Sequence, residues 1–162
     1  MHTWPILQSV LLLTLANGMP VVAKRVLRAH FAFPLDAGAR FLDGQPWLGP
    51  SKTIRGVVVS VVATAVVARL LGLSLAAGGL VAALAMIGDL FSSFVKRRLK
   101  FASSSQAIGL DQVPESLLPL LVCKETLSLT SIDVAIAVGV FFLGELILSR
   151  LLYNLRLRDE PY

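Results

Sequence analysis

Residues 75–98, LAAGGLVAALAMIGDLFSSFVKRR, join a long apolar segment to a polar and basic end. A helix that spans a lipid bilayer needs about 20 apolar residues, and this run supplies them before it reaches Lys96. Asp89 lies inside the run, about two turns before its end. Because an ionisable side chain is costly in a bilayer, Asp89 marks a candidate functional site as well as a membrane segment.

The composition is that of an integral membrane protein. Of the 162 residues, 56% are hydrophobic and only 15% are charged, and the mean hydropathy is +0.77. The length fits one membrane-embedded domain, residues 1–162, with no room for a separate soluble catalytic domain. The single cysteine, Cys123, excludes an intrachain disulfide and a cysteine-based metal site.

Five apolar runs follow one another along the chain, at residues 6–23, 56–71, 75–95, 113–129 and 132–153. The first three and the last are plausible spans, whereas the run at 113–129 is interrupted by charged residues and a proline. The first run is expected to be a retained span, because no basic residue precedes it and no small-residue cleavage site follows it. Small residues between positions 77 and 83 would let the third helix pack closely against its neighbours.

The basic residues favour five spans over four. They lie between the first two runs, after the third run and at the end of the chain: Lys24, Arg25, Arg28, Arg40, Lys52, Arg55, Lys96, Arg97, Arg98, Lys100, Arg150, Arg156 and Arg158. With five spans all of these fall on one side, and only Arg69 and Lys124 lie opposite. The positive-inside rule therefore predicts an all-α protein of about five transmembrane helices in the cytoplasmic membrane, with the N-terminus outside and the C-terminus cytoplasmic. Two cytoplasmic loops, roughly 24–52 and 100–112, would form a polar site.

The polar residues after Gly88 fall on one face of the predicted third helix. Spacings of three or four bring together Asp89, Ser92, Ser93, Lys96, Arg97 and Lys100. Asp111 would return to the same point if the third and fourth helices form a hairpin. Two carboxylates around triphosphate oxygens are the usual way to hold a hard divalent cation. The structural alternative is an ion pair of Asp89 with Lys96 or with a neighbouring helix.

A second polar segment, Pro50-Ser51-Lys52-Thr53-Ile54-Arg55-Gly56, precedes the second run. Ser51 is a good N-cap residue, so the helix is expected to begin there, with its free amides and positive dipole end facing the cytoplasm. Together with Lys52, Thr53 and Arg55, these amides would bind phosphate. The alternative is that the basic residues only anchor the helix to lipid headgroups.

Other polar residues carry weaker signals. Asp36 and Asp43 lie among turn residues and can simply cap turns, and Asp43 is also a substrate-binding candidate, as are Ser93 and Gln112. Glu145 lies inside the last span and needs a partner, for which any of the inside cations would serve. Asn17 interrupts the first span, where a substrate role and a packing role are equally open.

Several of these motifs occur together in one known family. In order along the chain, residues 35–44, 51–56, 88–98, 109–112 and 158–162 resemble the CDP-archaeol synthase family. The central block is also similar to the active-site region of the larger CDP-diacylglycerol synthases. The stretch 102–109 is plainer than the Gly-rich turn of those larger enzymes and lacks their further acidic residue, so the number of metal ions stays open.

The resemblance implies a five-helix cytidylyltransferase that uses CTP and Mg²⁺. It would convert a membrane lipid phosphate, such as 2,3-bis-O-geranylgeranyl-sn-glycerol 1-phosphate, into a CDP-lipid and pyrophosphate. By position, Asp89 and Asp111 match the metal-binding carboxylates, and Lys96 and Arg97 match the catalytic basic pair. The nucleotide-side motif corresponds to Ser51, Lys52, Thr53 and Arg55.

The partners that the resemblance implies are CTP, the lipid phosphate and the bilayer. No nucleic acid is expected as a partner, and a homodimer stays open. The alternatives are a phosphatidate cytidylyltransferase that makes CDP-diacylglycerol, another phosphotransfer enzyme of lipid metabolism, a non-catalytic binder of anionic lipid and an ion-conducting protein. An ion path through Asp89 and Glu145 is disfavoured because the charges gather at one membrane face. A simple lipid binder leaves the two carboxylates in the basic cluster unexplained.

The topology can be tested with single cysteines. We expect cysteines at Gln45, Ser104 and Asn154 to be labelled by a membrane-impermeant reagent only from the cytoplasmic side, and one at Ser74 only from outside. The reason is the excess of basic residues around the first three positions. Labelling of position 154 from outside would overturn the count of five spans.

Overall fold

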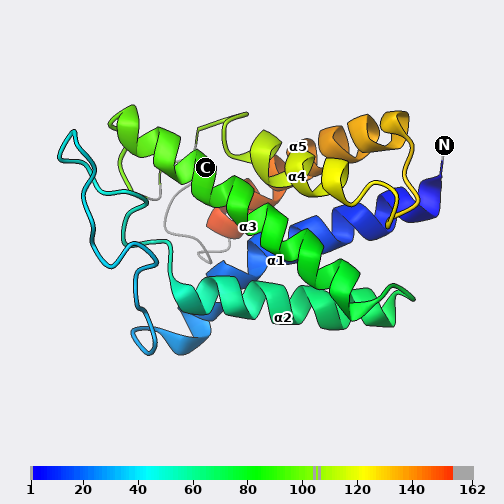
Figure 1. The fold of residues 1–162 in the computed structure, drawn as a ribbon, viewed down its shortest axis with the longest axis horizontal. Coiled ribbons are helices and arrows are strands. Elements are labelled where there is room, and N and C mark those ends of the chain that lie inside the picture. The colour runs from blue at the N-terminus through cyan, green and yellow to red at the C-terminus, as the bar shows by residue number, and fades with distance from the viewer. Residues whose placement is uncertain (1, 104, 106, 155–162) are drawn as a thin grey trace.

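A computed structural model describes residues 2–103, 105 and 107–154 of the chain (Figure 1). This part of the chain forms five helices: α1 (Thr3–Leu27), α2 (Ile54–Leu70), α3 (Leu75–Arg98), α4 (Gln112–Val122) and α5 (Ser131–Asn154). The expected all-helical class is therefore confirmed. Two isolated antiparallel bridges, Pro34 with Thr53 and Arg40 with Pro46, lie in the loop before α2.

The helices alternate in direction along the bundle. In Figure 1, α1, α3 and α5 run one way and α2 and α4 the other, so the N-terminus lies at one end. The loops 28–53 and 99–111 lie towards the opposite end, where α5 also finishes. This is the arrangement that five passages require. Arg156 and Arg158, which entered the charge argument, lie outside the described residues.

Three of the helices are long and apolar enough to cross a membrane: Thr3–Leu27, Leu75–Arg98 and Ser131–Leu151. Helix α2 has 17 residues and α4 only 11. At 1.5 Å per residue, α4 is about half as long as the hydrocarbon core is thick. The passage continues beyond α4 as turns, in which the amide of Leu127 donates to the carbonyl of Cys123 at 2.9 Å. The fourth run, interrupted in sequence, is thus the shortest helix.

Two boundaries differ from the expected ones. Helix α2 begins at Ile54, and its N-cap is Thr53, whose Oγ1 accepts the amide of Gly56 at 3.3 Å. The prediction of Ser51 as N-cap is wrong, because Lys52 and Ile54 are held extended by backbone hydrogen bonds with Leu35 and Phe33. Helix α3 ends at Arg98, so Lys100, which has a positive φ of 60°, does not continue its polar face.

Glycines bring α3 into close contact with both neighbours. A Cβ on Gly78 would lie 2.3 Å from Cβ of Ala68 on α2, which agrees with the expected close packing of this region. A Cβ on Gly88 would lie 2.4 Å from the carbonyl oxygen of Pro114 and 2.7 Å from Cα of Glu115 on α4. Since Asp89 follows Gly88, this contact holds the buried end of α4 against the candidate site.

We expect Gly88→Ala to destabilise the bundle by about 1–3 kcal/mol, because the added methyl forces α3 and α4 apart. Gly139→Ala on α5 is the matched control, since a Cβ there meets nothing within 4 Å. The measurement is thermal unfolding of the two purified variants in detergent. Equal stability of Gly88→Ala and the wild type would show that the α3–α4 contact is looser than described.

Candidate active site

One cavity of about 790 Å³ brings together residues of all five helices and both long loops. Ten of the predicted site residues line it: Ser51, Lys52, Thr53, Arg55, Asp89, Ser93, Lys96, Arg97, Asp111 and Gln112. Asp43 is not among the lining residues. The polar face of α3 and the segment before α2 therefore meet at a single site, as the motifs suggested.

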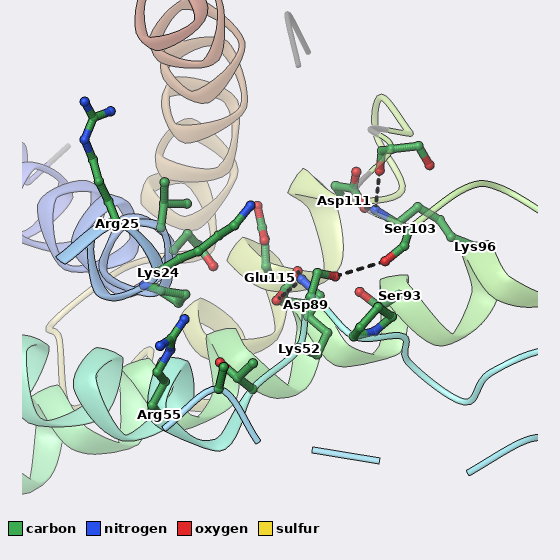
Figure 2. A pocket seen from close by; sticks show the side chains of 18 of the residues that line it. Lys24, Arg25, Lys52, Arg55, Asp89, Ser93, Lys96, Ser103, Asp111 and Glu115 are labelled. Atoms are coloured by element: carbon green, nitrogen blue, oxygen red, sulfur yellow. Dashed lines mark hydrogen bonds and ion pairs between the residues drawn. The ribbon is translucent and has the colours of Figure 1, made fainter. Parts of the chain in front are cut away.

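Lys52 and Asp89 form the central ion pair of this cavity (Figure 2). Nζ of Lys52 lies 2.7 Å from Oδ1 and 2.6 Å from Oδ2 of Asp89, and both side chains are only about one-fifth exposed. The backbone bridge before α2 holds Lys52 over α3. Lys96 is not the partner of Asp89, because the cation comes from the loop before α2, but Asp89 is in an ion pair and its structural role stays open.

Lys96 pairs with Asp111, which lies one residue before α4. Nζ of Lys96 lies 2.7 Å from Oδ1 of Asp111 and donates to the carbonyl of Ser105 at 2.8 Å. The other oxygen, Oδ2, accepts the amide of Ala107 at 2.8 Å. Oδ1 is in an ion pair but has no aligned hydrogen bond. The expected return of Asp111 to the end of α3 is thus present.

The loop 99–111 folds back onto α3 through side chain to backbone hydrogen bonds. Arg97 donates to the carbonyl of Ala102 at 2.9 Å, and Ser92 donates to that of Leu110 at 2.6 Å. Gln112 accepts the amide of Gly109 through Oε1 at 2.8 Å. These bonds occupy backbone carbonyls of the loop and hold it next to the cavity.

The loop 28–53 is ordered by Asp36. Its carboxylate accepts the amides of Gly38, Leu48 and Gly49, each at 3.0 Å. Burial alone would raise the pKa of this carboxyl, but the three amides outweigh burial and lower the pKa below its ordinary value. Asp36 therefore caps turns, which was one of the two roles considered for such residues.

Asp43 lies on a separate aromatic cluster. Oδ2 of Asp43 is 3.0 Å from Nε of Arg98, and its Oδ1 accepts the amide of Gln45 at 3.0 Å. The guanidinium of Arg98 stands 4.6 Å from the ring centre of Phe41 and 4.9 Å from that of Phe94. This cation–π contact attaches the loop to α3. A substrate-binding role for Asp43 stays a prediction.

Several cavity residues were not recognised as site residues in the sequence. Glu115 is only 3% exposed and shares a side-chain hydrogen bond with Glu145 on α5, a carboxyl partner that the sequence did not suggest. Its position four residues after Asp111, inside an apolar run, was the available signal. Lys24, Arg25 and Arg28 line the cavity from α1 and its C-terminal cap, beside Asn17, for which a substrate role had been left open. The basic residues among them had been taken as signs of topology.

The donor set suits a hard divalent cation. Carboxylate oxygens are the ligands that Mg²⁺ prefers; Oε1 of Glu115 is buried without a hydrogen-bond partner, and Oδ1 of Asp111 is buried with Lys96 as its ion-pair partner. Among the described residues, no group of three His, Cys, Asp or Glu side chains could hold a metal by itself. A cation here would complete its shell with substrate phosphates and water, as Mg²⁺ commonly does.

Comparison with known proteins points to one family. The family model described as CarS-like, CDP-archaeol synthase, matches residues 6–162. A CDP-archaeol synthase from Pyrobaculum calidifontis is 36% identical over 156 aligned residues, which cover 91% of this chain and 90% of that protein. Another, from Hyperthermus butylicus, is 39% identical over 104 residues, covering 60% of this chain and 59% of that protein.

A solved structure supports the same grouping. It belongs to an intramembrane enzyme for archaeal membrane lipids biosynthesis and superposes with a TM-score of 0.67. The two chains are 28% identical, and the match covers 85% of this chain and 90% of the other. The arrangement of helices described above therefore recurs in a membrane-embedded enzyme.

The role of Asp36 gives a prediction for the loop 28–53. We expect Asp36→Ala to accelerate tryptic cleavage in this loop about two- to fivefold, a range that allows for solvent screening of a partly exposed carboxylate. Glu125→Ala, in the turn after α4, is the control and should be cleaved at the wild-type rate.

The contribution of Asp36 to the stability of the loop should depend on pH. Because the pKa of Asp36 in the folded protein lies below its ordinary value of 3.8, this contribution is present at neutral pH. It should be lost as the pH falls below about 4. If Asp36→Ala is cleaved at the wild-type rate, Asp36 does not stabilise the loop.

Proposed function

Since the chain belongs to the CDP-archaeol synthase family, we propose that it transfers the cytidylyl group of CTP to a membrane lipid phosphate. The products are a CDP-lipid of the CDP-archaeol type and pyrophosphate, which places the enzyme in phospholipid biosynthesis. The observation that carries this proposal is the cavity, in which the pairs Lys52–Asp89 and Lys96–Asp111 lie inside an otherwise apolar helix bundle. Such a site has the charges that a metal–nucleotide needs at a depth that a lipid headgroup can reach.

The reaction is a phosphoryl-type substitution. An oxygen of the lipid phosphate attacks the α-phosphorus of CTP, a P–O bond forms, and the bond between the α-phosphorus and the bridging oxygen to the β-phosphate breaks. Pyrophosphate leaves with the electron pair. The attacking monoester is already an anion near pH 7, so no general base has to remove a proton. The absence of a histidine from the residues that line the cavity is consistent with this chemistry.

The basic side chains neutralise phosphate charge during the transfer. Lys52, Lys96 and Arg97 lie around the carboxylates, where they can stabilise the extra charge that develops on the phosphate oxygens. Lys52 is bound to Asp89, and a phosphate would offer its ammonium group a second partner. Ser51, Thr53, Ser93 and Gln112 line the same cavity and would orient the nucleotide by hydrogen bonds.

Asp89 and Asp111 are the residues that would hold a divalent cation, which we take to be Mg²⁺. When bound, such an ion supplies positive charge to the phosphate oxygens. Removing either carboxylate therefore removes charge from the centre of the cavity without removing a covalent participant.

The fold and the charge pattern support a location for the protein in the cell. The chain is a multi-pass membrane protein, with apolar helices of spanning length and an intramembrane structural relative. We place it in the cytoplasmic membrane, with the N-terminus outside and the cavity open to the cytoplasm, where CTP is made available. The basic residues at the ends of α1 and α3 and in the loop 28–53 support this orientation.

The decisive experiment is magnesium-dependent release of pyrophosphate from CTP in the presence of a dialkylglycerol phosphate. Asp89→Asn and Asp111→Asn should each lower turnover at least about a hundredfold, because each removes a charge from the site without changing its shape. Lys52→Ala should chiefly raise the KM for CTP, since it contacts phosphates that are charged in the ground state.

Glu125→Gln serves as the control, because Glu125 is an exposed carboxylate outside the cavity. It should leave the rate unchanged. Near-normal activity of Asp89→Asn at saturating magnesium would assign Asp89 to structure. No pyrophosphate release by the wild type with any lipid phosphate would refute the proposed activity.

A further inference from the structure

One face of α1 lines the cavity along much of its length. The residues that contribute are Asn17, Pro20, Val21, Lys24, Arg25 and Arg28, which recur at spacings of three or four and so share one side of the helix. Between the first and the last of them the chain rises about 16 Å. The apolar or neutral positions come first and the three cations come last. This order, apolar and then charged towards the loop end of the bundle, matches the order of chain and headgroup in a lipid.

The cations of the cavity lie towards opposite ends of it. In Figure 2, Arg25 and Arg55 lie on one side of the view, the side chain of Lys24 extends from that side towards Glu115, and Lys96 lies with Asp111 on the other side. Asp89, Lys52 and Glu115 are between the two groups. The cavity therefore has a carboxylate centre with cationic groups on both sides.

An in-line displacement needs such an arrangement. The entering oxygen and the departing pyrophosphate lie on opposite sides of the α-phosphorus, and both carry negative charge. If the α-phosphate is bound near Asp89, one cationic end faces the attacking phosphate and the other faces the leaving group. The chemistry alone does not say which end belongs to which substrate.

The surroundings of α1 decide between the two ends. On the same turns of α1, Val22 and Val26 are 49% and 71% exposed, so the helix presents apolar side chains outward beside its cations. A lipid acceptor keeps its chains in the bilayer and must approach along such a surface. The opposite end is formed with the polar loop 99–111, which suits a nucleotide that arrives from water. The loop contributes Ser103 and Ser105 to the cavity wall.

We infer that the α1 wall of the cavity is the subsite for the phosphate of the acceptor lipid. Lys24 and Arg28, with Arg25 beside them, bind the phosphate monoester, and Pro20 and Val21 contact the start of its chain. This inference rests on the proposed cytidylyl transfer and adds to it the residues that distinguish the acceptor from CTP. The shared chemistry is that of a phosphate dianion, which the lipid and free pyrophosphate could both supply.

The test separates the two substrates kinetically. The full-length protein in mixed micelles is assayed with CTP, magnesium and a dialkylglycerol phosphate, and the KM is measured for each substrate in turn. Lys24→Gln and Arg28→Gln should each raise the KM for the lipid phosphate about fivefold, and the double variant about thirtyfold, from the usual worth of a basic residue at a lipid surface. The KM for CTP and the inhibition constant for pyrophosphate should stay within about twofold of the wild type.

Two further variants make the result specific. Arg40→Gln removes an exposed cation from the loop 28–53 that does not line the cavity, and it should change neither KM, which excludes general attraction to an anionic micelle. Val21→Trp fills the apolar part of the α1 wall without changing charge. It should raise the KM for the lipid and leave the KM for CTP unchanged. If the double variant does not fold, this variant tests whether α1 forms the lipid subsite.

The outcomes distinguish this inference from the proposed function. An inactive wild type with every lipid phosphate would refute the transfer reaction itself. An active wild type with an unchanged lipid KM in the double variant, or with equal increases for CTP and lipid, would overturn the α1 subsite and leave the function standing. Loss of pyrophosphate inhibition in Lys24→Gln would assign α1 to the leaving group instead.

Discussion

The ion pair between Lys52 and Asp89 is the interaction on which the site depends. An unpaired carboxylate inside an apolar helix costs several kcal/mol, so α3 can contain Asp89 only if a cation reaches it. That cation comes from the loop 28–53, which must therefore fold back over the bundle. The bridge between Pro34 and Thr53, the amides around Asp36 and the stacking of Arg98 on Phe41 hold the loop in that position.

The same requirement explains the loop 99–111. Lys96 and Arg97 are buried at the end of α3, where Lys96 pairs with Asp111 and the carbonyl of Ser105 and Arg97 donates to the carbonyl of Ala102. Both loops are thus shaped by charges that the membrane helices carry. A consequence is that Lys52 and Asp89, like Lys96 and Asp111, neutralise each other. A phosphate or a cation that binds in the cavity has to compete with these ion pairs.

Hydropathy predicted the helices because the energetic cost of exposing polar backbone in a bilayer leaves few alternatives to a helix. It could not predict where α2 begins, since Ser51 and Thr53 are both competent caps and a distant strand-like contact with Phe33 and Leu35 selects Thr53. Hydropathy also could not predict the length of α4, although the charged residues and the proline in that run indicated an interrupted helix.

In the candidate site, the sequence identified those residues whose charge is energetically costly within or beside a membrane span. Asp89 and Lys96 were identifiable because charged residues within or beside a span demand an explanation, and Asp111 followed from the hairpin. Lys24 and Arg28 had another explanation, the positive-inside rule, which hid their position on the cavity wall. The inward face of α1 depends on packing, and no periodicity in the sequence distinguishes a cation that faces a cavity from one that faces headgroups.

The five-helix bundle can carry the proposed transfer because this chemistry asks little of the protein. The nucleophile is already ionised and the leaving group is stabilised by charge, so catalysis needs positioning and neutralisation but no covalent participant. Helix ends at the membrane surface supply both the positioning and the neutralising charges with few residues. Gly88 lets α3 and α4 approach until Asp89 and Glu115 border one cavity, and the loops place Lys52 and Lys96 around it. A lipid need not leave the bilayer to reach such a site, and a nucleotide need not enter the bilayer beyond the headgroup level. A site inside the bundle therefore suits an acceptor whose chains stay in the bilayer.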